Sequence, residues 1–192
     1  MAEFSEFLFR GLMFEAEAEK FRNAGLRVGA DSSDSERSLL NDVLLPFDIA
    51  TRNAALQMSR IYAMMYCFEN AVRELITKRL TEKHGANWWS TKVPASVKSK
   101  AESRKTEAKD NSWLEGQKDD ILGFMDFGEL ATLIIHNWAD FEDLIPTQHW
   151  LKQRMDELEK ARNFIAHNRV LLPTEFQRIE MYVADWNRQV GL

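Results

Sequence analysis

The sequence predicts an all-α protein. Only 4 prolines and 8 glycines occur in 192 residues, and most of them lie between periodic segments, as in a mainly helical fold. Apolar residues recur at alternating spacings of four and three, which is the period of a helix with one buried face. Strand-like alternation is hard to find. These observations together favour a bundle of helices.

The first 45 residues predict a helical extension followed by a polar loop. The loop is expected at residues 29–37, which are rich in serine and aspartate. We therefore expect residues 1–45 to be an N-terminal appendage and residues 46–192 to be the helical domain. The imperfect helical stripe of the appendage consists of Phe4, Leu8, Leu12, Phe14 and Phe21.

A long helix is predicted from about Asp48 to His84. Gly85 is expected to end it, because glycine readily adopts the left-handed conformation that follows many helices. One face of this helix is apolar and is expected to be buried in the bundle. Its members are Ile61, Met65, Phe68, Val72 and Leu75.

The stretch 86–118 is basic and has two interpretations. A helix with a solvated, charged face is the favoured one, and a basic strip that contacts RNA is the other. The candidate RNA-binding side chains are Lys98, Lys100, Arg104 and Lys105, together with Arg169 further along the chain.

Two further helix starts are marked by capping residues. Asp126 and Glu129 have the spacing of a capping box, which predicts a helix running to about Trp138. After Pro146, Thr147 is expected to cap the next helix. The predicted inner stripe of that helix is Leu151, Met155, Leu158, Arg162, Ile165 and Arg169.

Pro173 is expected to end this helix and to begin the last one. Proline cannot continue a helix from its interior but fits well in the first turn. Thr174 and Gln177 have the spacing of a second capping box. The last helix is expected to have an inner face of Phe176, Ile179, Val183 and Trp186.

Composition excludes several classes of protein. A net charge of -5 argues against coating of nucleic acid by bulk electrostatics, so contact with a polyanion needs a local basic patch. The single cysteine, Cys67, cannot form an intramolecular disulfide, which fits a reducing cytoplasm. No uncharged run has the length of a membrane span, and residues 1–10 lack a basic leader. We therefore expect a soluble cytoplasmic protein with no membrane contact.

An arginine and a histidine near the C-terminus are the most informative pair. Arg162 is predicted on the apolar seam of its helix, where an always-charged guanidinium needs a carboxylate or a phosphate. His167 follows five residues later and can titrate near neutral pH. On an ideal helix the two positions lie about 140° apart. A joint site therefore requires either distortion of the helix end or a second copy of the chain.

Several segments of the sequence resemble the HEPN superfamily. Its hallmark is an arginine, four to six residues, then a histidine, often with a polar residue after the arginine; here these are Arg162, Asn163 and His167. The resemblance covers about residues 48–190 and is strongest to the HEPN branch of a nuclear messenger-RNA surveillance endonuclease and of many bacterial proteins. It implies an antiparallel HEPN bundle. The supporting segments are residues 66–76, 88–89, 126–130 and 150–152.

The resemblance implies a metal-independent endoribonuclease that works as a homodimer and needs no cofactor. The ribose 2'-hydroxyl of the RNA would be the nucleophile, His167 the general acid or base, and Arg162 the group that stabilises charge on the phosphate. Asn163 would orient the phosphate or His167. Glu69 or Asn70 would hold the Arg162 guanidinium. A toxin or defence context, with a regulatory or antitoxin protein, is also expected.

Two alternatives stay open. HEPN domains also serve as non-catalytic modules for RNA binding, protein binding or dimerisation. From spacing alone, Arg162 is a structural arginine paired with Glu69, while His167 and Arg169 complement the negative end of the helix dipole. In some HEPN toxins a tyrosine two residues after the histidine is modified by the antitoxin. Arg169 stands at that position here, so this form of control is not expected.

Overall fold

The computed structural model describes residues 43–110 and 120–191. The predicted N-terminal stripe and loop lie outside these residues. The chain divides into two compact units, Met1–Ala55 and Leu56–Leu192. In the first unit, the carboxylate of Asp48 accepts a hydrogen bond from the backbone nitrogen of Thr51 at 2.9 Å, which caps the long helix. All packing described below belongs to the second unit.

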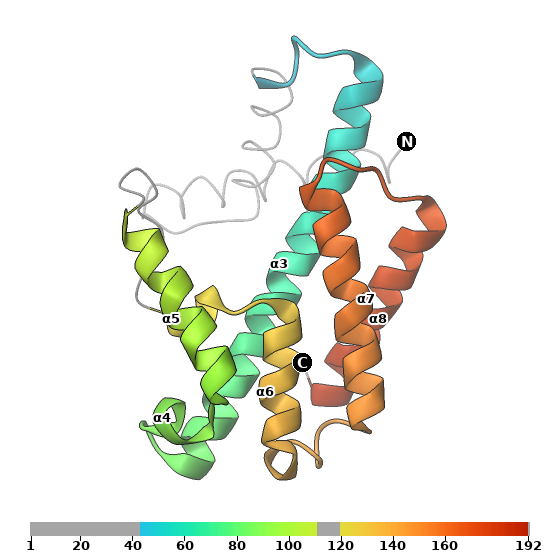
Figure 1. The fold of residues 1–192 in the computed structure, drawn as a ribbon. Coiled ribbons are helices and arrows are strands. Elements are labelled where there is room, and N and C mark those ends of the chain that lie inside the picture. The colour runs from blue at the N-terminus through green and yellow to red at the C-terminus, as the bar shows by residue number, and fades with distance from the viewer. Residues whose placement is uncertain (1–42, 111–119, 192) are drawn as a thin grey trace, which may run out of the picture. The chain divides into compact units, whose positions relative to one another are not determined.

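Six α-helices and two 3₁₀ helices account for most of the described residues, which contain no strand. The all-α prediction is confirmed. The long helices α3, α5, α6, α7 and α8 alternate in direction (Figure 1). In chain order the elements are α3 (Ile49–His84), α4 (Trp88–Lys92), α5 (Ala95–Asp110), η2 (Ile121–Phe124), α6 (Phe127–His136), η3 (Trp138–Asp140), α7 (Gln148–Ala166) and α8 (Pro173–Val190).

Helix α3 closely matches the predicted long helix. It ends at His84, and Gly85 follows with a φ of 75°, in the left-handed region that glycine tolerates. The expected inner face is buried except at Leu75, which is half-buried, while Ile76 is fully buried. The helix therefore contributes its core face as the sequence pattern predicts.

Aromatic side chains join four helices in the core. Phe68 of α3 stacks on Phe127 of α6 with ring centroids 5.8 Å apart. Phe68 also meets Trp186 of α8 edge-on at 5.4 Å, and Trp186 lies against Trp150 of α7 at 6.3 Å. Because such rings each bury a large apolar area, this cluster fixes α3, α6, α7 and α8 relative to one another.

Arg73 of α3 forms hydrogen bonds to the segment that precedes α6. Its Nε donates to the carbonyl of Leu122 at 2.9 Å, and its Nη2 donates to the carbonyl of Met125 at 3.2 Å. The same guanidinium pairs with Glu69, one turn earlier on α3. The charged group in this partly buried position thus gives the Met125 carbonyl a donor and adds a second bond to the Leu122 carbonyl, which also accepts from the Met125 nitrogen at 3.1 Å.

Helix starts agree only partly with prediction. Thr147 caps α7 by accepting from the Trp150 backbone nitrogen at 3.0 Å, as expected. Helix α8 does begin at Pro173, but its capping contact joins the Leu172 backbone nitrogen to the Glu175 carboxylate at 2.7 Å. The predicted Thr174–Gln177 box is therefore wrong. Among the described residues, no helix is both long and apolar enough to cross a membrane.

Candidate functional site at the end of α7

The arginine–histidine pair lies where α7 ends. The helix stops at Ala166, and His167 is the residue that closes it. Asn168 follows with a φ of 58°, in the left-handed region. The sequence predicted that the helix would continue to Pro173, and this is wrong. The helix ends earlier because asparagine is one of the few residues that adopt the left-handed conformation at low cost.

Two backbone hydrogen bonds fix the helix end. The Asn168 nitrogen donates to the Ile165 carbonyl at 2.8 Å, and the Arg169 nitrogen donates to the Phe164 carbonyl at 3.3 Å. This pair of bonds is the Schellman arrangement, which satisfies carbonyls that a helix end leaves free. His167 is thereby held on a defined turn of backbone.

Arg162 lies just before the last turn of α7 and is half-buried, not buried on the seam as predicted. The N-terminal turn of α6 gives a reason. A side chain added at Gly128, in the first turn of α6, would come within 3.2 Å of Glu159 on α7. Helix α6 therefore begins beside Glu159, which lies about one turn before Arg162. Arg162 is thus beyond the part of α7 that α6 covers.

The guanidinium of Arg162 has no acidic partner among the described residues. Its Nη1 donates to the Asn163 side-chain oxygen at 3.1 Å, and that is its one side-chain hydrogen bond in the described chain. An arginine presents five donors. Most of its hydrogen-bonding capacity is therefore directed to solvent or to a ligand.

His167 and Arg169 are both exposed. The guanidinium carbon of Arg169 lies 5.3 Å from the ring centroid of Phe164, a cation–π contact that folds Arg169 back over the last turn of α7. Arg169 is outside the helix, so its predicted place in the inner stripe is wrong. Arg162, His167 and Arg169 place positive or titratable groups at the negative end of the α7 dipole.

Glu69 and Asn70 do not hold Arg162. Glu69 pairs with Arg73, and the Asn70 side-chain nitrogen donates to the Tyr66 carbonyl at 2.8 Å. The supporting role predicted for them is therefore wrong. The reason is local, because Arg73 lies one turn from Glu69 on the same helix and reaches it more directly than Arg162 can.

Arg104 is a structural residue and not a free member of a basic strip. Its guanidinium donates to Glu129 at 2.6 and 3.2 Å, to Asp126 at 2.7 Å and to the Phe124 carbonyl at 2.8 Å. Lys100 lies 3.9 Å from Glu129 as well. Arg104 is thus engaged within the fold, and the RNA-facing interpretation of Lys98, Lys100, Arg104, Lys105 and Arg169 stays a prediction.

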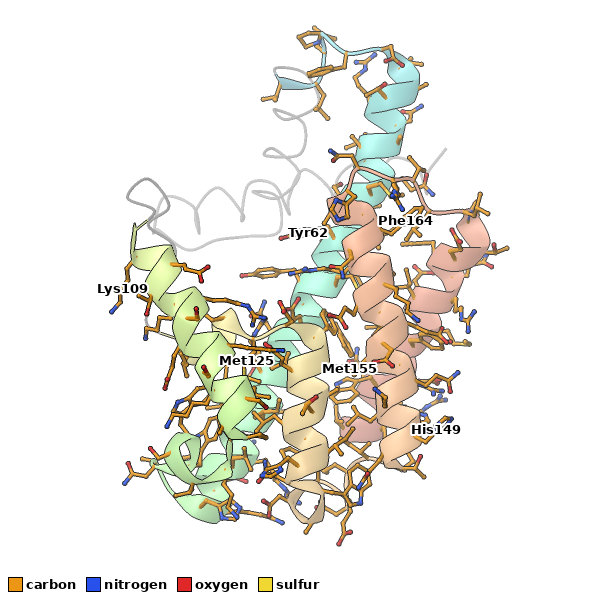
Figure 2. The ribbon with its side chains drawn as sticks, in the orientation of Figure 1. Tyr62, Lys109, Met125, His149, Met155 and Phe164 are labelled. Atoms are coloured by element: carbon orange, nitrogen blue, oxygen red, sulfur yellow. The ribbon has the colours of Figure 1, made fainter. Side chains whose placement is uncertain are left out.

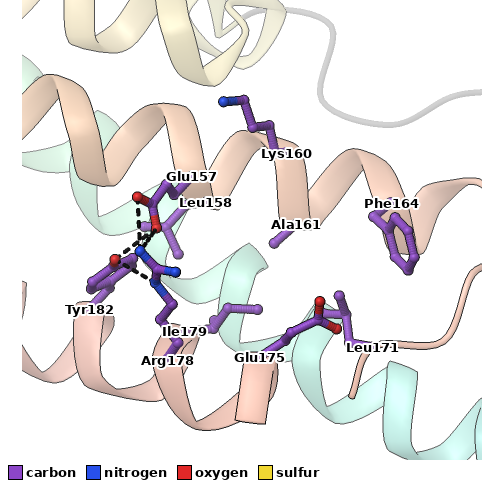
Figure 3. Close-up of a pocket in the computed structure, with 10 residues that line it drawn as sticks. All are labelled: Glu157, Leu158, Lys160, Ala161, Phe164, Leu171, Glu175, Arg178, Ile179 and Tyr182. Atoms are coloured by element: carbon purple, nitrogen blue, oxygen red, sulfur yellow. Dashed lines mark hydrogen bonds and ion pairs between the residues drawn. The ribbon is translucent and has the colours of Figure 1, made fainter. Parts of the chain in front are cut away.

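A groove between α7 and α8 has no counterpart in the sequence predictions. It has a volume of about 460 Å³, and its floor includes Leu158, Ala161 and Ile179. At one end Arg178, Tyr182 and Glu157 bond to one another, the tyrosine hydroxyl donating to the carboxylate at 2.7 Å (Figure 3). The four-residue spacing of Arg178 and Tyr182 was visible in the sequence, but their shared partner on α7 was not. Arg162 does not line this groove.

Comparison with known proteins identifies a family. The model of the Swt1-like HEPN family matches residues 63–191, which is most of the chain and includes the whole arginine–histidine segment. No curated protein and no solved structure gives a significant match.

Proposed function

The chain belongs to the Swt1-like HEPN family, and we propose that it is a metal-independent endoribonuclease whose site is completed by a second copy. The observation that carries this proposal is the state of Arg162. It is half-buried near the C-terminal end of α7, without an acidic partner among the described residues, and five residues before an exposed histidine. A phosphate diester would supply the anion that the described residues do not.

The proposed reaction divides the work between the two side chains. The 2'-oxygen of a ribose attacks the adjacent phosphorus, and the bond from phosphorus to the 5'-oxygen breaks, which leaves a 2',3'-cyclic phosphate and a 5'-hydroxyl. One His167 accepts the 2'-hydroxyl proton and a second donates a proton to the leaving oxygen. Arg162 stabilises the charge that builds on the phosphate, and Asn163 positions the guanidinium through the bond it already accepts.

Helix geometry favours two copies over one. Arg162 and Asn163 lie within α7, while His167 is the residue that closes the helix, about 140° around the axis from Arg162 by ideal geometry. The His167 nitrogen still bonds to the Asn163 carbonyl at 3.2 Å, so the backbone follows the helix up to His167. A symmetric pair brings the histidine of one copy toward the arginine of the other.

The test is cleavage of RNA by the purified chain in excess chelator. We expect cleavage, loss of about 10²- to 10³-fold in rate for Arg162→Ala, and loss of about 10²- to 10⁴-fold for His167→Ala. A 2'-deoxy residue at the cut should block the reaction. His149→Ala is the matched control, because His149 is exposed and lies at the opposite end of α7 from Phe164 (Figure 2).

If RNA substrates of varied sequence and structure all stay intact, the proposed endoribonuclease activity is refuted. If the same chain then binds RNA, and Arg162→Ala weakens that binding, the function is that of a non-catalytic HEPN module. A toxin or defence context with a regulatory partner belongs to this proposal, and expression of the wild type and of His167→Ala in growing cells tests it. Growth arrest by the wild type alone would support a toxin.

A further inference from the structure

Two tyrosines of α3 present their rings to solvent on one side of the helix. Tyr62 is 56% exposed and Tyr66 is 61% exposed. They stand four residues apart, so by ideal geometry their directions differ by about 40°. No hydrogen bond joins either hydroxyl to another described residue. An exposed aromatic pair of this kind is a surface on which flat rings can stack.

A polar hollow continues the same side of α3 toward its C-terminal end. The hollow has a volume of about 390 Å³. Helical rotation places Asn70 and Thr77 within about 80° of Tyr62, so the tyrosines and the hollow share one side of the helix. We call this side the α3 face. The residues that line the hollow are Asn70, Arg73, Glu74, Thr77, Lys78 and Asp120.

The charges around the hollow cancel. Arg73 and Lys78 are positive, while Glu74 and Asp120 are negative. The guanidinium of Arg73 is already used by Glu69 and by two backbone carbonyls. A hollow without net charge fits an uncharged polar ring better than it fits a phosphate.

Several hydrogen-bonding groups of the hollow have capacity to spare. Thr77 and Lys78 are exposed, and their side chains bond to no other described residue. The Asn70 amide donates one hydrogen bond, to the Tyr66 carbonyl at 2.8 Å, and therefore keeps a second N–H. These donors and acceptors can bind the polar edge of a ring whose neighbour in the strand stacks on a tyrosine.

We propose that the α3 face binds unpaired RNA, with bases stacked on Tyr62 and Tyr66 and a neighbouring base in the hollow. Asn70 and Thr77 bind the edge of that base, and Lys78 contacts a phosphate. Unpaired bases can be bound in this way because their faces and their edges are both free. The inference rests on the proposed function and adds its substrate class, which is single-stranded RNA.

The lining of the hollow disfavours a protein partner. The anchor of a protein interface is typically an aromatic or apolar side chain that fills a well-packed pocket. All six lining side chains are polar or charged, so such an anchor would leave them without hydrogen-bond partners. A base carries its own donors and acceptors and avoids this cost.

The start of α6 relates the α3 face to the arginine–histidine segment. Arg73 bonds to the segment that precedes α6, and Gly128 in the first turn of α6 lies against Glu159 of α7. Helices α3 and α7 run in opposite directions (Figure 1). Tyr66, before Arg73 on α3, and Arg162, after Glu159 on α7, therefore lie beyond the same end of α6. RNA stacked on the tyrosines is thus at the end of the bundle that carries the proposed phosphate site.

Binding of RNA by the full-length His167→Ala chain tests the stacking, because this variant removes the proposed proton transfer and keeps the α3 face. Fluorescence anisotropy of a labelled, unpaired oligonucleotide measures the Kd. We expect an added Tyr66→Ala change to raise the Kd about tenfold, through loss of one stacked base. Tyr66→Phe keeps the ring and should stay within about twofold. Met181→Ala, which removes an exposed side chain of α8, is the matched control and should leave the Kd unchanged.

The hollow is tested by salt dependence and base preference. Lys78→Ala should weaken all sequences alike and lower the slope of log Kd against log salt by about 0.7, the loss of one phosphate contact. Asn70→Ala and Thr77→Ala should instead reduce the differences in Kd among oligomers of the four bases. Lys152→Ala, which removes an exposed lysine of α7, should change neither quantity. Circular dichroism of each variant checks that the helices are intact.

Two further ligands separate unpaired RNA from other sources of the same chemistry. A duplex of the same sequence should bind about tenfold more weakly or worse, because its bases are already paired and stacked. A free mononucleotide should also bind more weakly than the oligonucleotide, because it offers one ring. A mononucleotide that binds as tightly as the oligonucleotide assigns the hollow to a free nucleotide and overturns the proposal.

Two other results overturn it as well. These are an unchanged Kd in Tyr66→Ala, and equal Kd values for the single strand and the duplex. If the chain nevertheless cleaves RNA, only the α3 face is removed and the nuclease stands. If the chain binds unpaired RNA through Tyr66 but cleaves none, the α3 face stands and the nuclease is removed.

Discussion

Replacing Arg104 by alanine should destabilise the fold and leave RNA binding largely unchanged. Arg104 joins α5 to the start of α6 through Glu129, Asp126 and the Phe124 carbonyl. Glu129 also accepts from the backbone nitrogen of Asp126 at 3.0 Å. Its side chain is only 12% exposed, so removing the guanidinium leaves a mostly buried carboxylate without its main partner.

The size of the effect follows from these contacts. A hydrogen bond to a charged group contributes about 1.5–3 kcal/mol net, and removing one partner adds the cost of an unpaired buried group. Arg104 is itself 34% exposed, so solvent screening reduces these contributions. We expect R104A to lower the free energy of unfolding by about 2 kcal/mol. The double variant R104A with E129Q should recover part of the loss, because a neutral amide is cheaper to bury.

The loss should depend on pH in a defined direction. Burial alone would raise the pKa of Glu129, but the Arg104 hydrogen bond, the Asp126 backbone bond and the charges of Arg104 and Lys100 hold it below 4.5. A lowered folded-state pKa gives stability that is complete above the unfolded pKa and is lost as the pH falls. The difference between wild type and R104A should therefore be full at pH 7 and should shrink below pH 4.5.

Urea unfolding followed by circular dichroism measures this difference, with Lys109→Ala, an exposed change on the same helix, as the control. If R104A unfolds at the wild-type urea concentration but binds RNA much more weakly, the structural assignment is refuted. Arg104 would then belong to an RNA-binding strip, the less favoured of the two interpretations of the sequence.

Two further predictions concern other local features. In Asp140→Asn, we expect the free energy of unfolding to fall by about 1 kcal/mol at pH 7, and this loss should disappear as the pH falls below 3.8. Burial raises the pKa of Asp140, but its contacts with His84 at 2.6 Å and Lys83 at 3.6 Å hold the pKa lower. Urea titrations at several pH values measure the loss, and a loss that does not change with pH would contradict the prediction. In Asn168→Val, we expect a loss of about 1–2 kcal/mol, because a β-branched residue is strained at a φ of 58°. Asn168→Gly should unfold at or above the wild-type temperature, and equal melting of the valine and glycine variants would argue against the left-handed turn.

Local signals predicted the helices well. The apolar stripe of α3 and the glycine that follows the helix are signals between residues that are close in the chain, so the bounds of that helix could be predicted from the sequence. The end of α7 was less certain, because two stop signals compete there. Asn168 acts five residues before Pro173, and only the backbone conformation shows that it does.

Partners of charged residues could not be predicted in the same way. Arg104 bonds to carboxylates 22 and 25 residues later in the chain, and such contacts depend on how α5 and α6 pack. The Glu157 carboxylate likewise meets Arg178 only because α7 and α8 lie together. Sequence spacing identified the charged residues but not which of them neutralise one another.

This distinction decides how Arg162 is interpreted. Spacing alone favoured Arg162 as a structural arginine paired with Glu69, but in the structure the Glu69 carboxylate pairs with Arg73. In residues 43–110 and 120–191, the arginines that pair with carboxylates are Arg73, Arg79, Arg104, Arg154, Arg178 and Arg188. Arg162 is half-buried and is not among them. A partly desolvated guanidinium is costly without an anion. Arg52 is also half-buried and without such a pair, but Arg162 is the one of the two that a histidine follows five residues later, and this favours Arg162 as the residue that binds a phosphate.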